Sequence, residues 1–436
     1  MIGDSPAEPE PPDAPPGPKE IWAWCMYDFA NSSFTTLIVT VAYAVYFVQV
    51  VAAPLGTDGG AERAWFWGYA ASMLVAALLA PPLGAYADAH AAKRRLLLWS
   101  SLVCVGCTAL LFFVEAGDVW LGLLLFGIAN VAFDLGFMFC SAFLVELAPV
   151  EAMGRISGYG WGLGYVGGLL SLALAYPFIH GGFAEANLVS YRLSFPVTAL
   201  FFLLGALPTF LFLRERARPL PEQDRPSWAT TFRRLRQTFA RLRHYRDLGM
   251  YLAAYLVYTD AINTVIVATG IFANKVLDFS PGDLIIYFLV TQVTAGVGAV
   301  WFGRMADRIG TKRTITLTLA AWMAVVAGAA LVRTHAQFYA LGLVAGSILG
   351  ANQTASRTLL AQFTPAGRQA EFFSFFSVTG KFAAVIGPLV YAEVTAWTGS
   401  QRWAIVSMAV FFGAGLLLFR TVDEQRGRAA AASTAC

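Results

Sequence analysis

Long apolar stretches follow one another along almost the whole chain, separated by short polar segments. Twelve of them approach or exceed the roughly 20 residues that an α-helix needs to cross a bilayer. They lie at residues 21–50, 65–87, 96–114, 119–147, 156–178, 194–213, 248–273, 283–306, 314–332, 337–362, 371–395 and 402–420. The composition agrees, since 58% of the residues are hydrophobic and 13% are charged, whereas soluble domains carry about 25% charged residues. The pattern predicts an all-α integral membrane protein with twelve transmembrane helices.

A change in composition divides these stretches into two sets of six. Between residues 214 and 246 the apolar pattern stops, and ten arginines face three acidic residues. The predicted domains are a tail at 1–20, a six-helix bundle at 21–213, a basic linker at 214–247, a second six-helix bundle at 248–421 and a tail at 422–436.

The linker has a helical pattern of its own. Apolar residues recur there at steps of three and four among the arginines, at Phe232, Leu235, Phe239 and Leu242. This spacing predicts an amphipathic helix lying on anionic lipid of the inner leaflet. Nucleic-acid binding, the other use of a basic run, is disfavoured between two sets of membrane spans.

Lysine and arginine gather on the side of the membrane that holds the linker and both ends of the chain. Because basic loops stay in the cytoplasm, both termini are predicted to be cytoplasmic and the protein to lie in the inner (plasma) membrane. The proline-rich start lacks the cationic and apolar regions of a signal peptide. We expect it, and the alanine-rich tail after Asp423, to be disordered.

A short motif occurs once in each half of the chain. Gly-x-x-x-Asp is followed by a basic cluster in both copies, and the glycines are 219 positions apart (303 minus 84). The residues concerned are Gly84, Asp88 and Arg94 in the first copy and Gly303, Asp307, Arg308 and Arg313 in the second. One copy alone fits a chance match with a positive-inside signal. Two copies in corresponding places indicate a tandem duplication, as in many transporters.

The motif has a physical meaning that does not depend on its source. Glycine at the end of a helix lets two helices approach closely. The aspartate four residues later lies on the same face, where it can meet the N-terminus of a neighbouring helix or an arginine. We expect Asp88 and Asp307 to act as latches that close the cytoplasmic side.

The motif resembles that of the major facilitator superfamily of secondary transporters. Further stretches are similar to its vacuole-effluxer-like branch: residues 24–34 (WCMYDFANSSF), 258–264 (YTDAINT), 350–357 (GANQTASR) and 371–376 (EFFSFF), the last running on to Gly380-Lys381 and Gly387-Pro388. Cys25-Met26 and Ala261 depart from that pattern without disturbing its polar positions. The resemblance implies two six-helix bundles around a central cavity that opens alternately to either face. It also implies export of an amino acid or a related metabolite.

Polar residues inside spans are costly in lipid and usually face a cavity or a partner. The candidates for substrate binding or coupling are Asp28, Asn31, Asn130, Asp134, Asp260, Asn263, Gln353, Arg357 and Lys381. Asp28 with Asn31, and Asp260 with Asn263, are three residues apart and share a helical face. Each pair can bind substrate, or it can serve as interhelical glue or a cap.

The charges suggest how the candidates divide the work. Arg357 can hold a substrate carboxylate in a two-pronged contact while an aspartate meets an amine, which suits a zwitterion. Alternatively, Asp260 only pairs with Arg357 or Lys381. Asp134, in the middle of its span, is a candidate proton carrier, because its charge state can be coupled to a gradient.

Other function classes lack their motifs. The sequence has no phosphate-binding loop of an ATP-driven pump, no His-Glu-x-x-His and no Gly-x-Ser-x-Gly, so ATP hydrolysis, metalloprotease and serine-hydrolase chemistry are disfavoured. We therefore expect no enzyme, cofactor or metal. The resemblance implies a monomeric secondary transporter that exports a small-molecule substrate, and Asp134 within its span suggests coupling to protons. The alternatives are efflux of amphipathic or drug-like compounds and a membrane sensor that keeps the fold without turnover.

Overall fold

The computed structural model describes residues 15–55, 60–221, 245–279, 281–383 and 386–433. Within these ranges every regular element is a helix. The first half contains α1 (Pro18–Ser33), continued by η1 (Phe34–Val41), α2 (Tyr43–Tyr46) and η2 (Phe47–Val51), then α3 (Gly60–His90), α4 (Lys93–Leu110), α5 (Val119–Ala142), the short α6 (Leu144–Leu147), α7 (Met153–Ile179) and α8 (Leu188–Phe212). The second half contains α10 (Arg246–Leu277), α11 (Pro281–Ile309), α12 (Thr311–Leu331), α13 (His335–Gln362), α14 (Gln369–Phe382), α15 (Ile386–Thr398), α16 (Gln401–Arg420) and α17 (Glu424–Ser433).

Eleven helices in the described ranges are long and apolar enough to cross a membrane. The twelfth span is α13, which has 28 residues. Its hydropathy is lower because it carries the polar side chains of Asn352, Gln353 and Arg357. The predicted all-α fold with twelve spans is confirmed.

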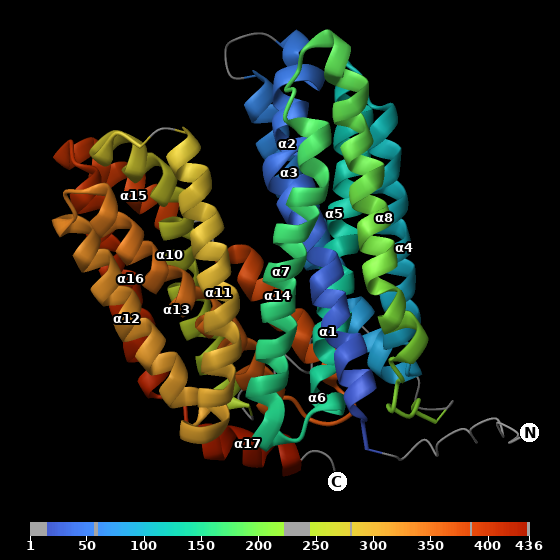
Figure 1. Ribbon diagram of the computed structural model, residues 1–436. Helices are drawn as coiled ribbons and strands as arrows, with labels where there is room; N and C mark the ends of the chain where they lie inside the picture. The colour runs from blue at the N-terminus through green and yellow to red at the C-terminus, as the bar shows by residue number, and fades with distance from the viewer. Residues whose placement is uncertain (1–14, 56–59, 222–244, 280, 384–385, 434–436) are drawn as a thin grey trace, which may run out of the picture.

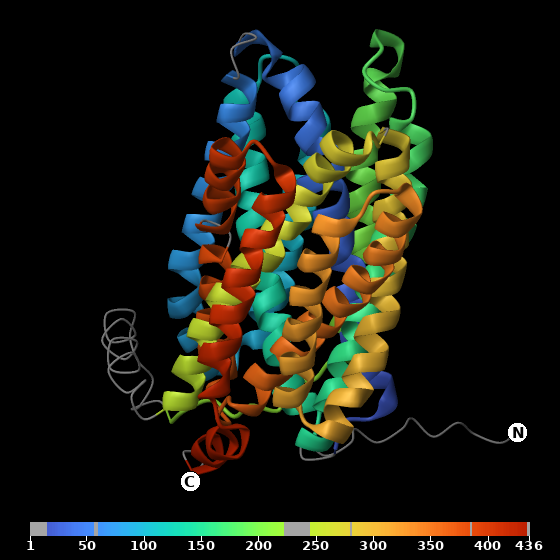
Figure 2. The same ribbon diagram turned by 90° about the vertical axis from the view of Figure 1, so that its left-hand side faces the viewer.

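The twelve spans form two bundles that lie side by side (Figure 1). The most extensive contacts between the bundles join α7 with α11 and α3 with α14. We call the end that holds the start of α1 and α17 the terminal face, and the opposite end the far face. Figure 1 shows the bundles drawing apart toward the far face, and Figure 2 shows the second bundle from its side.

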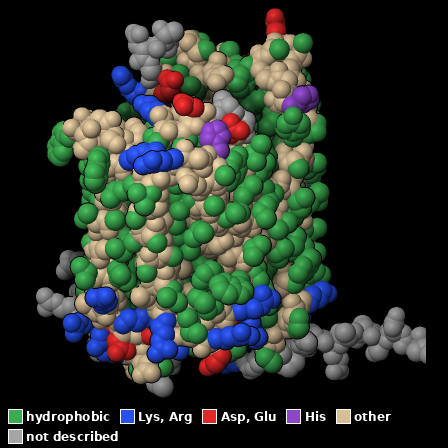
Figure 3. All heavy atoms as spheres, turned by 60° about the vertical axis from the view of Figure 1, so that its left-hand side comes forward, with side chains coloured by type: hydrophobic (Ala, Val, Ile, Leu, Met, Phe, Trp, Pro, Cys, Tyr) green, Lys and Arg blue, Asp and Glu red, His purple; other side chains and the backbone are tan. Residues whose placement is uncertain are grey.

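The outer surface is that of a membrane protein. Figure 3 shows a broad band of hydrophobic side chains between two zones that contain charged ones, with lysine and arginine gathered at the terminal face. Many large apolar side chains in the spans are well exposed, among them Leu78 at 65% and Val297 at 65%. In a bilayer these side chains contact lipid chains.

Glycine permits the close contact between the two bundles. A Cβ atom on Gly303 of α11 would lie 2.5 Å from the carbonyl oxygen of Gly154 in α7, and one on Gly158 would lie 2.5 Å from that of Ala299. A Cβ atom on Gly84 of α3 would lie 2.5 Å from the carbonyl oxygen of Ala370 in α14. Small residues are how membrane helices approach backbone to backbone. Both motif glycines therefore lie at crossings between the halves.

The expectation of a disordered tail after Asp423 is wrong for residues 424–433, which form α17. The guanidinium of Arg426 donates to Asp247 at 2.5 and 2.6 Å, and Gly427 packs on the ring of Phe363. These contacts supply the stabilisation that composition alone did not reveal. The N-terminal residues 1–14 and the predicted amphipathic helix of the linker lie outside the described residues.

Candidate functional site

A cavity of about 230 Å³ lies between the bundles. Its walls come from both halves of the chain, and they combine aromatic side chains with hydroxyl, amide and guanidinium groups. The lining residues are Phe137, Ser141, Trp161, Tyr255, Thr259, Ile262, Asn263, Ile266, Leu349, Asn352, Gln353, Ser356, Arg357, Phe376 and Gly380. Of the nine candidates from the sequence, Asn263, Gln353 and Arg357 line this cavity.

Arg357 joins the second bundle to the first. Its Nη1 donates to Oδ2 of Asp28 at 2.8 Å, and its Nε and Nη2 donate to the side-chain and main-chain oxygens of Ser157 at 3.0 and 2.8 Å. Both partners of this ion pair are buried, with Asp28 at 3% and Arg357 at 2% exposure. One alternative from the sequence was that Arg357 or Lys381 pairs with Asp260. The structure gives Arg357 the partner Asp28 instead, because α13 contacts α7 and α7 packs directly on α1.

Two indole rings flank the guanidinium group. Its carbon lies 4.9 Å from the ring centre of Trp24 and 5.3 Å from that of Trp161. Cation–π contacts of this kind stabilise a desolvated arginine. Gly160 leaves the room for the pair, since a Cβ atom there would lie 2.5 Å from Oδ2 of Asp28 and 2.7 Å from Nη2 of Arg357.

A second ion pair crosses between the bundles. The ammonium group of Lys381 on α14 binds Oδ1 of Asp134 on α5, and the two side chains are 16% and 10% exposed. Neither residue lines the described cavity wall, but their neighbours Gly380 and Phe137 do. Removing one partner of such a pair leaves a buried charge without compensation, which costs several kcal/mol.

Asp260 and Asn263 both contact the eleventh span, span 11, which consists of α14 and α15. Oδ2 of Asp260 accepts a hydrogen bond from the backbone N–H of Gly387 at 2.8 Å, and Nδ2 of Asn263 donates to the carbonyl oxygen of Ala383. In the second half of the chain, the two residues therefore make the contacts expected of helix caps. Asn263 also lines the cavity.

The remaining candidates make contacts between helices. Nδ2 of Asn130 on α5 donates to Oγ of Ser72 on α3 at 2.9 Å, inside the first bundle. The hydroxyl of Tyr165 on α7 donates to Oε1 of Gln353 on α13, between the halves. Asn31 is buried on α1, one turn beyond Asp28, and lies outside the cavity lining.

Both motif aspartates bind the N-terminus of a helix in the opposite bundle. Asp88 accepts the backbone N–H groups of Ala370 and Glu371, at 3.0 and 2.8 Å, where α14 begins. Asp307 accepts those of Gly154 and Arg155, at 2.8 and 2.9 Å, where α7 begins. A carboxylate at this place satisfies two free N–H groups and the positive end of the helix dipole.

The basic residues of the motif have less uniform positions. The guanidinium of Arg94 donates to the carbonyl oxygen of Phe210 at 2.5 Å, whereas Arg308 and Arg313 are exposed at the terminal face. Lys93 is the first residue of the basic cluster that follows Asp88. Its side chain is fully buried and forms an ion pair with Glu146. Its burial could not be read from its place in a run of cations.

The tandem duplication is visible in a second set of contacts at this face. Glu215, just after the first bundle, accepts the N–H groups of Lys93 and Arg94 at the start of α4. Glu424, just after the second bundle, accepts those of Thr311 and Lys312 at the start of α12. Burial raises the pKa of Glu215, and its two backbone hydrogen bonds oppose that shift.

Other lining residues were missed by the search for charged and amide side chains. Ser141, Thr259 and Ser356 are neutral hydroxyls, which membrane helices use as often for packing as for binding. The indole ring of Trp161 on α7 also lines the cavity. Asn352 was visible within the 350–357 stretch, and its amide donates to Thr318 at 3.2 Å.

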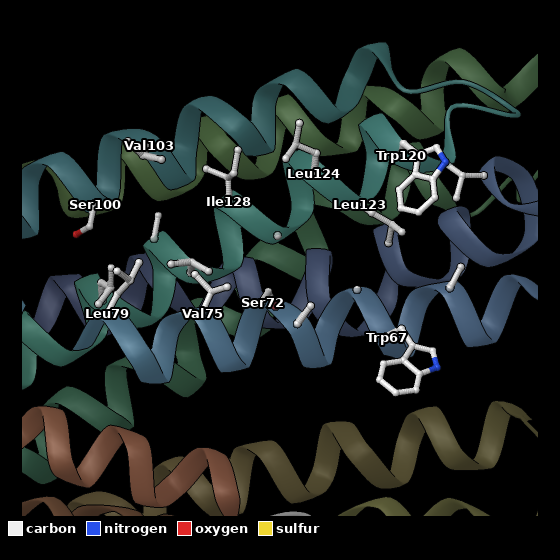
Figure 4. A pocket seen from close by; sticks show the side chains of 18 of the residues that line it. Trp67, Ser72, Val75, Leu79, Ser100, Val103, Trp120, Leu123, Leu124 and Ile128 are labelled. Carbon is white, nitrogen blue, oxygen red and sulfur yellow. The ribbon is translucent and has the colours of Figure 1, made fainter. Parts of the chain in front are cut away.

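A larger hollow, of about 1,180 Å³, lies outside the space between the bundles. It runs along α3, α4 and α5 between apolar side chains, and Trp67 and Trp120 stand on either side of one end (Figure 4). The hydroxyls of its two serines, Ser72 and Ser100, donate to carbonyl oxygens of their own helices. In a bilayer this groove is filled by hydrocarbon, so its size does not make it the polar site.

Comparisons with known proteins agree with this architecture. A family model described as vacuole effluxer Atg22-like matches residues 145–432. The uncharacterized MFS-type transporter YxiO of Bacillus subtilis is 30% identical over 410 residues, which cover 92% of this chain and 94% of that protein. Autophagy-related protein 22-1 of Neosartorya fischeri is 25% identical over 298 residues, 63% of this chain and 49% of that one, so the chain matches about half the length of this fungal relative.

Solved structures share the fold at low sequence identity. The human organic anion transporter MFSD10 superposes with a TM-score of 0.73 at 16% identity, covering 93% of this chain and all of that one. A bacterial homologue of the iron transporter ferroportin, in its outward-facing state, gives 0.68 at 13% identity, covering 92% and 98%. The chain therefore belongs to the vacuole effluxer Atg22-like family and is an MFS-type transporter.

Proposed function

We propose that this transporter exports a small polar metabolite, an amino acid or another zwitterion, by proton-coupled alternating access. The observation that carries the proposal is the pair of ionic contacts, Asp28 with Arg357 and Asp134 with Lys381, that join the bundles beside a cavity lined by both aromatic and polar side chains. The cavity of about 230 Å³ is smaller than the roughly 300–1,000 Å³ of pockets for drug-sized ligands. Its size, together with the guanidinium and amide groups in its wall, favours a small substrate over a drug-sized one.

Substrate recognition is assigned to the Arg357 side of the cavity. Arginine has five N–H donors, and the three contacts to Asp28 and Ser157 leave others for a substrate carboxylate. Tyr255 and Phe376, whose rings stack with centroids 4.2 Å apart, line the same cavity, so an ammonium group bound there would lie beside aromatic rings. Both ends of a zwitterion then have partners in the same cavity.

Coupling is assigned to Asp134 and Lys381. A proton on Asp134 removes the charge that holds Lys381, so the ionic contact between the bundles weakens and the halves are free to rotate. When the contact opens, a proton neutralises Asp134 and a substrate carboxylate would compensate Lys381, so that neither partner is left as a buried charge. This links movement of the halves to the proton gradient.

The latches complete the cycle. We place both termini in the cytoplasm and the protein in the inner (plasma) membrane, because lysine and arginine gather at the terminal face (Figure 3). The bonds of Asp88 and Asp307 then hold the cytoplasmic side closed in the conformation described here. We further propose a monomer, with anionic lipid bound by the basic linker.

Counterflow in proteoliposomes tests the proposal. Vesicles containing the protein are preloaded with one unlabelled amino acid at a time and given the same labelled compound outside. An active compound must produce transient accumulation, and an imposed pH gradient must drive net movement. Efflux of an amphipathic dye with no response to any amino acid would support the drug-efflux alternative, and no turnover of either kind would support the sensor.

A further inference from the structure

Span 11 comprises two helices, α14 and α15, and its backbone leaves the helical conformation at Ala383. α14 ends at Phe382, and the next residue, Ala383, leaves the helical conformation with φ −82° and ψ 59°. α15 begins at Ile386, so Pro388 lies in its first turn. Proline is accepted there because its missing N–H would have no partner, but its ring is incompatible with a helix that continues through the preceding turn.

One turn of α10 binds the end of α14 and the start of α15. The carboxylate of Asp260 accepts the N–H of Gly387 in the first turn of α15, and the amide of Asn263 donates to the carbonyl of Ala383 at the end of α14. Each group has the polarity that its helix end requires, an acceptor for an N-terminus and a donor for a C-terminus. Within a membrane, where water cannot replace these bonds, their loss is costly.

These contacts determine where Lys381 lies. α14 is fixed at its first turn by Asp88 of the other bundle, and at its last turn by Asn263. Lys381 is in that last turn, directed to Asp134. α15 packs on α16 and α10, within its own bundle. The two halves of span 11 therefore belong to different contact networks.

We propose that Asp260 and Asn263 are positioning residues: they hold span 11 as two helices and thereby place Lys381 against Asp134. The inference rests on the proposed function in taking that ion pair as the coupling element. The role needs a hydrogen-bond acceptor at position 260 and not a negative charge. An asparagine there keeps an acceptor oxygen, whereas leucine has none.

Gly387 is part of the same arrangement. A Cβ atom on it would lie 2.2 Å from the hydroxyl oxygen of Thr264 and 3.1 Å from Oδ1 of Asp260. A methyl group at this position therefore pushes the first turn of α15 away from α10. Removing the Thr264 hydroxyl takes away the severe contact and leaves two milder ones, each at 3.1 Å, with Oδ1 and the backbone oxygen of Asp260.

The first test measures position without transport. Spin labels are attached at Phe382 and Val267, which are 55% and 66% exposed, after Cys107 and Cys436 are replaced by serine. Asp260→Leu, Asn263→Leu and Gly387→Ala should shift and broaden the label-to-label distance. Asp260→Asn and the double variant Gly387→Ala/Thr264→Ala should stay close to the parent. Thr269→Ala is the matched control, because its hydroxyl bonds only within α10.

The second test uses the pH profile of uptake in vesicles. Asp260→Leu should lower gradient-driven accumulation by about 5- to 30-fold, as expected for loss of a cap, while Asp260→Asn keeps both the rate and the pH profile. Loss of accumulation in Asp260→Asn would make Asp260 a proton carrier and overturn the positioning role. Unchanged distances in Asp260→Leu and Gly387→Ala would overturn it as well. If the parent transports no compound, the proposed function fails while the distances still decide this inference.

Discussion

Lys381 of α14 and Asp134 of α5 form an ion pair that crosses from one six-helix bundle to the other. The contact lies beside the cavity, and it involves the same helix that Asp88 holds at its other end. Movement of the bundles must therefore break it. Replacing either charged residue with a neutral one should therefore affect coupling to the proton gradient most directly.

Asp134→Asn should abolish accumulation driven by a pH gradient while exchange of substrate continues. The neutral isostere keeps the shape but removes the titrating charge, and it leaves Lys381 without compensation, so the melting temperature in detergent should fall. Adding Lys381→Gln should restore the melting temperature but not the accumulation. Asp118→Asn, in an exposed loop, is the control. Accumulation that survives in Asp134→Asn would exclude coupling through this carboxylate.

Replacement of Arg357 separates substrate recognition from ion pairing. Arg357→Gln and Asp28→Asn should each destabilise the protein by about 3–5 kcal/mol, because each leaves a buried group without its partner. The double variant should recover stability but not transport, since the carboxylate-binding group is gone. These four proteins form a double-mutant cycle, and its interaction energy measures how strongly Asp28 and Arg357 stabilise each other.

Arg357→Lys refines the same question. Lysine keeps the charge but loses the planar fork, so substrate binding should weaken severely while the protein still folds. Thermal stabilisation by substrate and uptake in vesicles are measured on the same samples. Recovery of transport in the double variant Arg357→Gln/Asp28→Asn would show that Arg357 serves only to neutralise Asp28.

Asp88→Ala and Asp307→Ala test the latches. Each removes two backbone hydrogen bonds at the start of a helix in the opposite bundle, and loss of such a cap costs about 0.5–2 kcal/mol. A cysteine placed at Ser141 in the cavity should become more reactive to a membrane-impermeant thiol reagent applied from the terminal face. Arg308→Ala, at an exposed position, is the control. Equal labelling of all four proteins would contradict the latch role.

The membrane spans could be predicted because hydrocarbon forces every span to satisfy its own backbone, which makes long apolar helices the outcome. Even α13 was found from its length and its pattern, although Arg357 lies within it. The sequence also predicted the kind of partner that the motif aspartates bind. A carboxylate at the end of a membrane helix can meet the N-terminus of a neighbouring helix or an arginine. Their particular partners, at the starts of α14 and α7, follow from the packing of the two bundles.

The sequence did not predict which charged residues from distant parts of the chain form ion pairs. Asp28 and Asp260 occupy equivalent motifs, yet Asp28 binds Arg357 and Asp260 binds the first turn of α15. Spacing shows which residues share a face of one helix, but not which helix that face meets. The departure from the helix at Ala383 was likewise missed, because residues 371–395 are mostly apolar and Gly387-Pro388 was not used as a stop.

Gly160→Ala should disable transport by displacing the Asp28–Arg357 pair. The added methyl group would lie 2.5 Å from Oδ2 of Asp28 and 2.7 Å from Nη2 of Arg357, so the pair must move or α7 must shift from α1. Gly106→Ala in α4 is the matched control, since nothing lies within 4 Å of its Cβ position and alanine favours a helix by about 1 kcal/mol. Melting temperature and uptake are compared in both variants. If Gly160→Ala kept parental uptake and stability as Gly106→Ala should, the tight fit of the ion pair against α7 would not be required for transport.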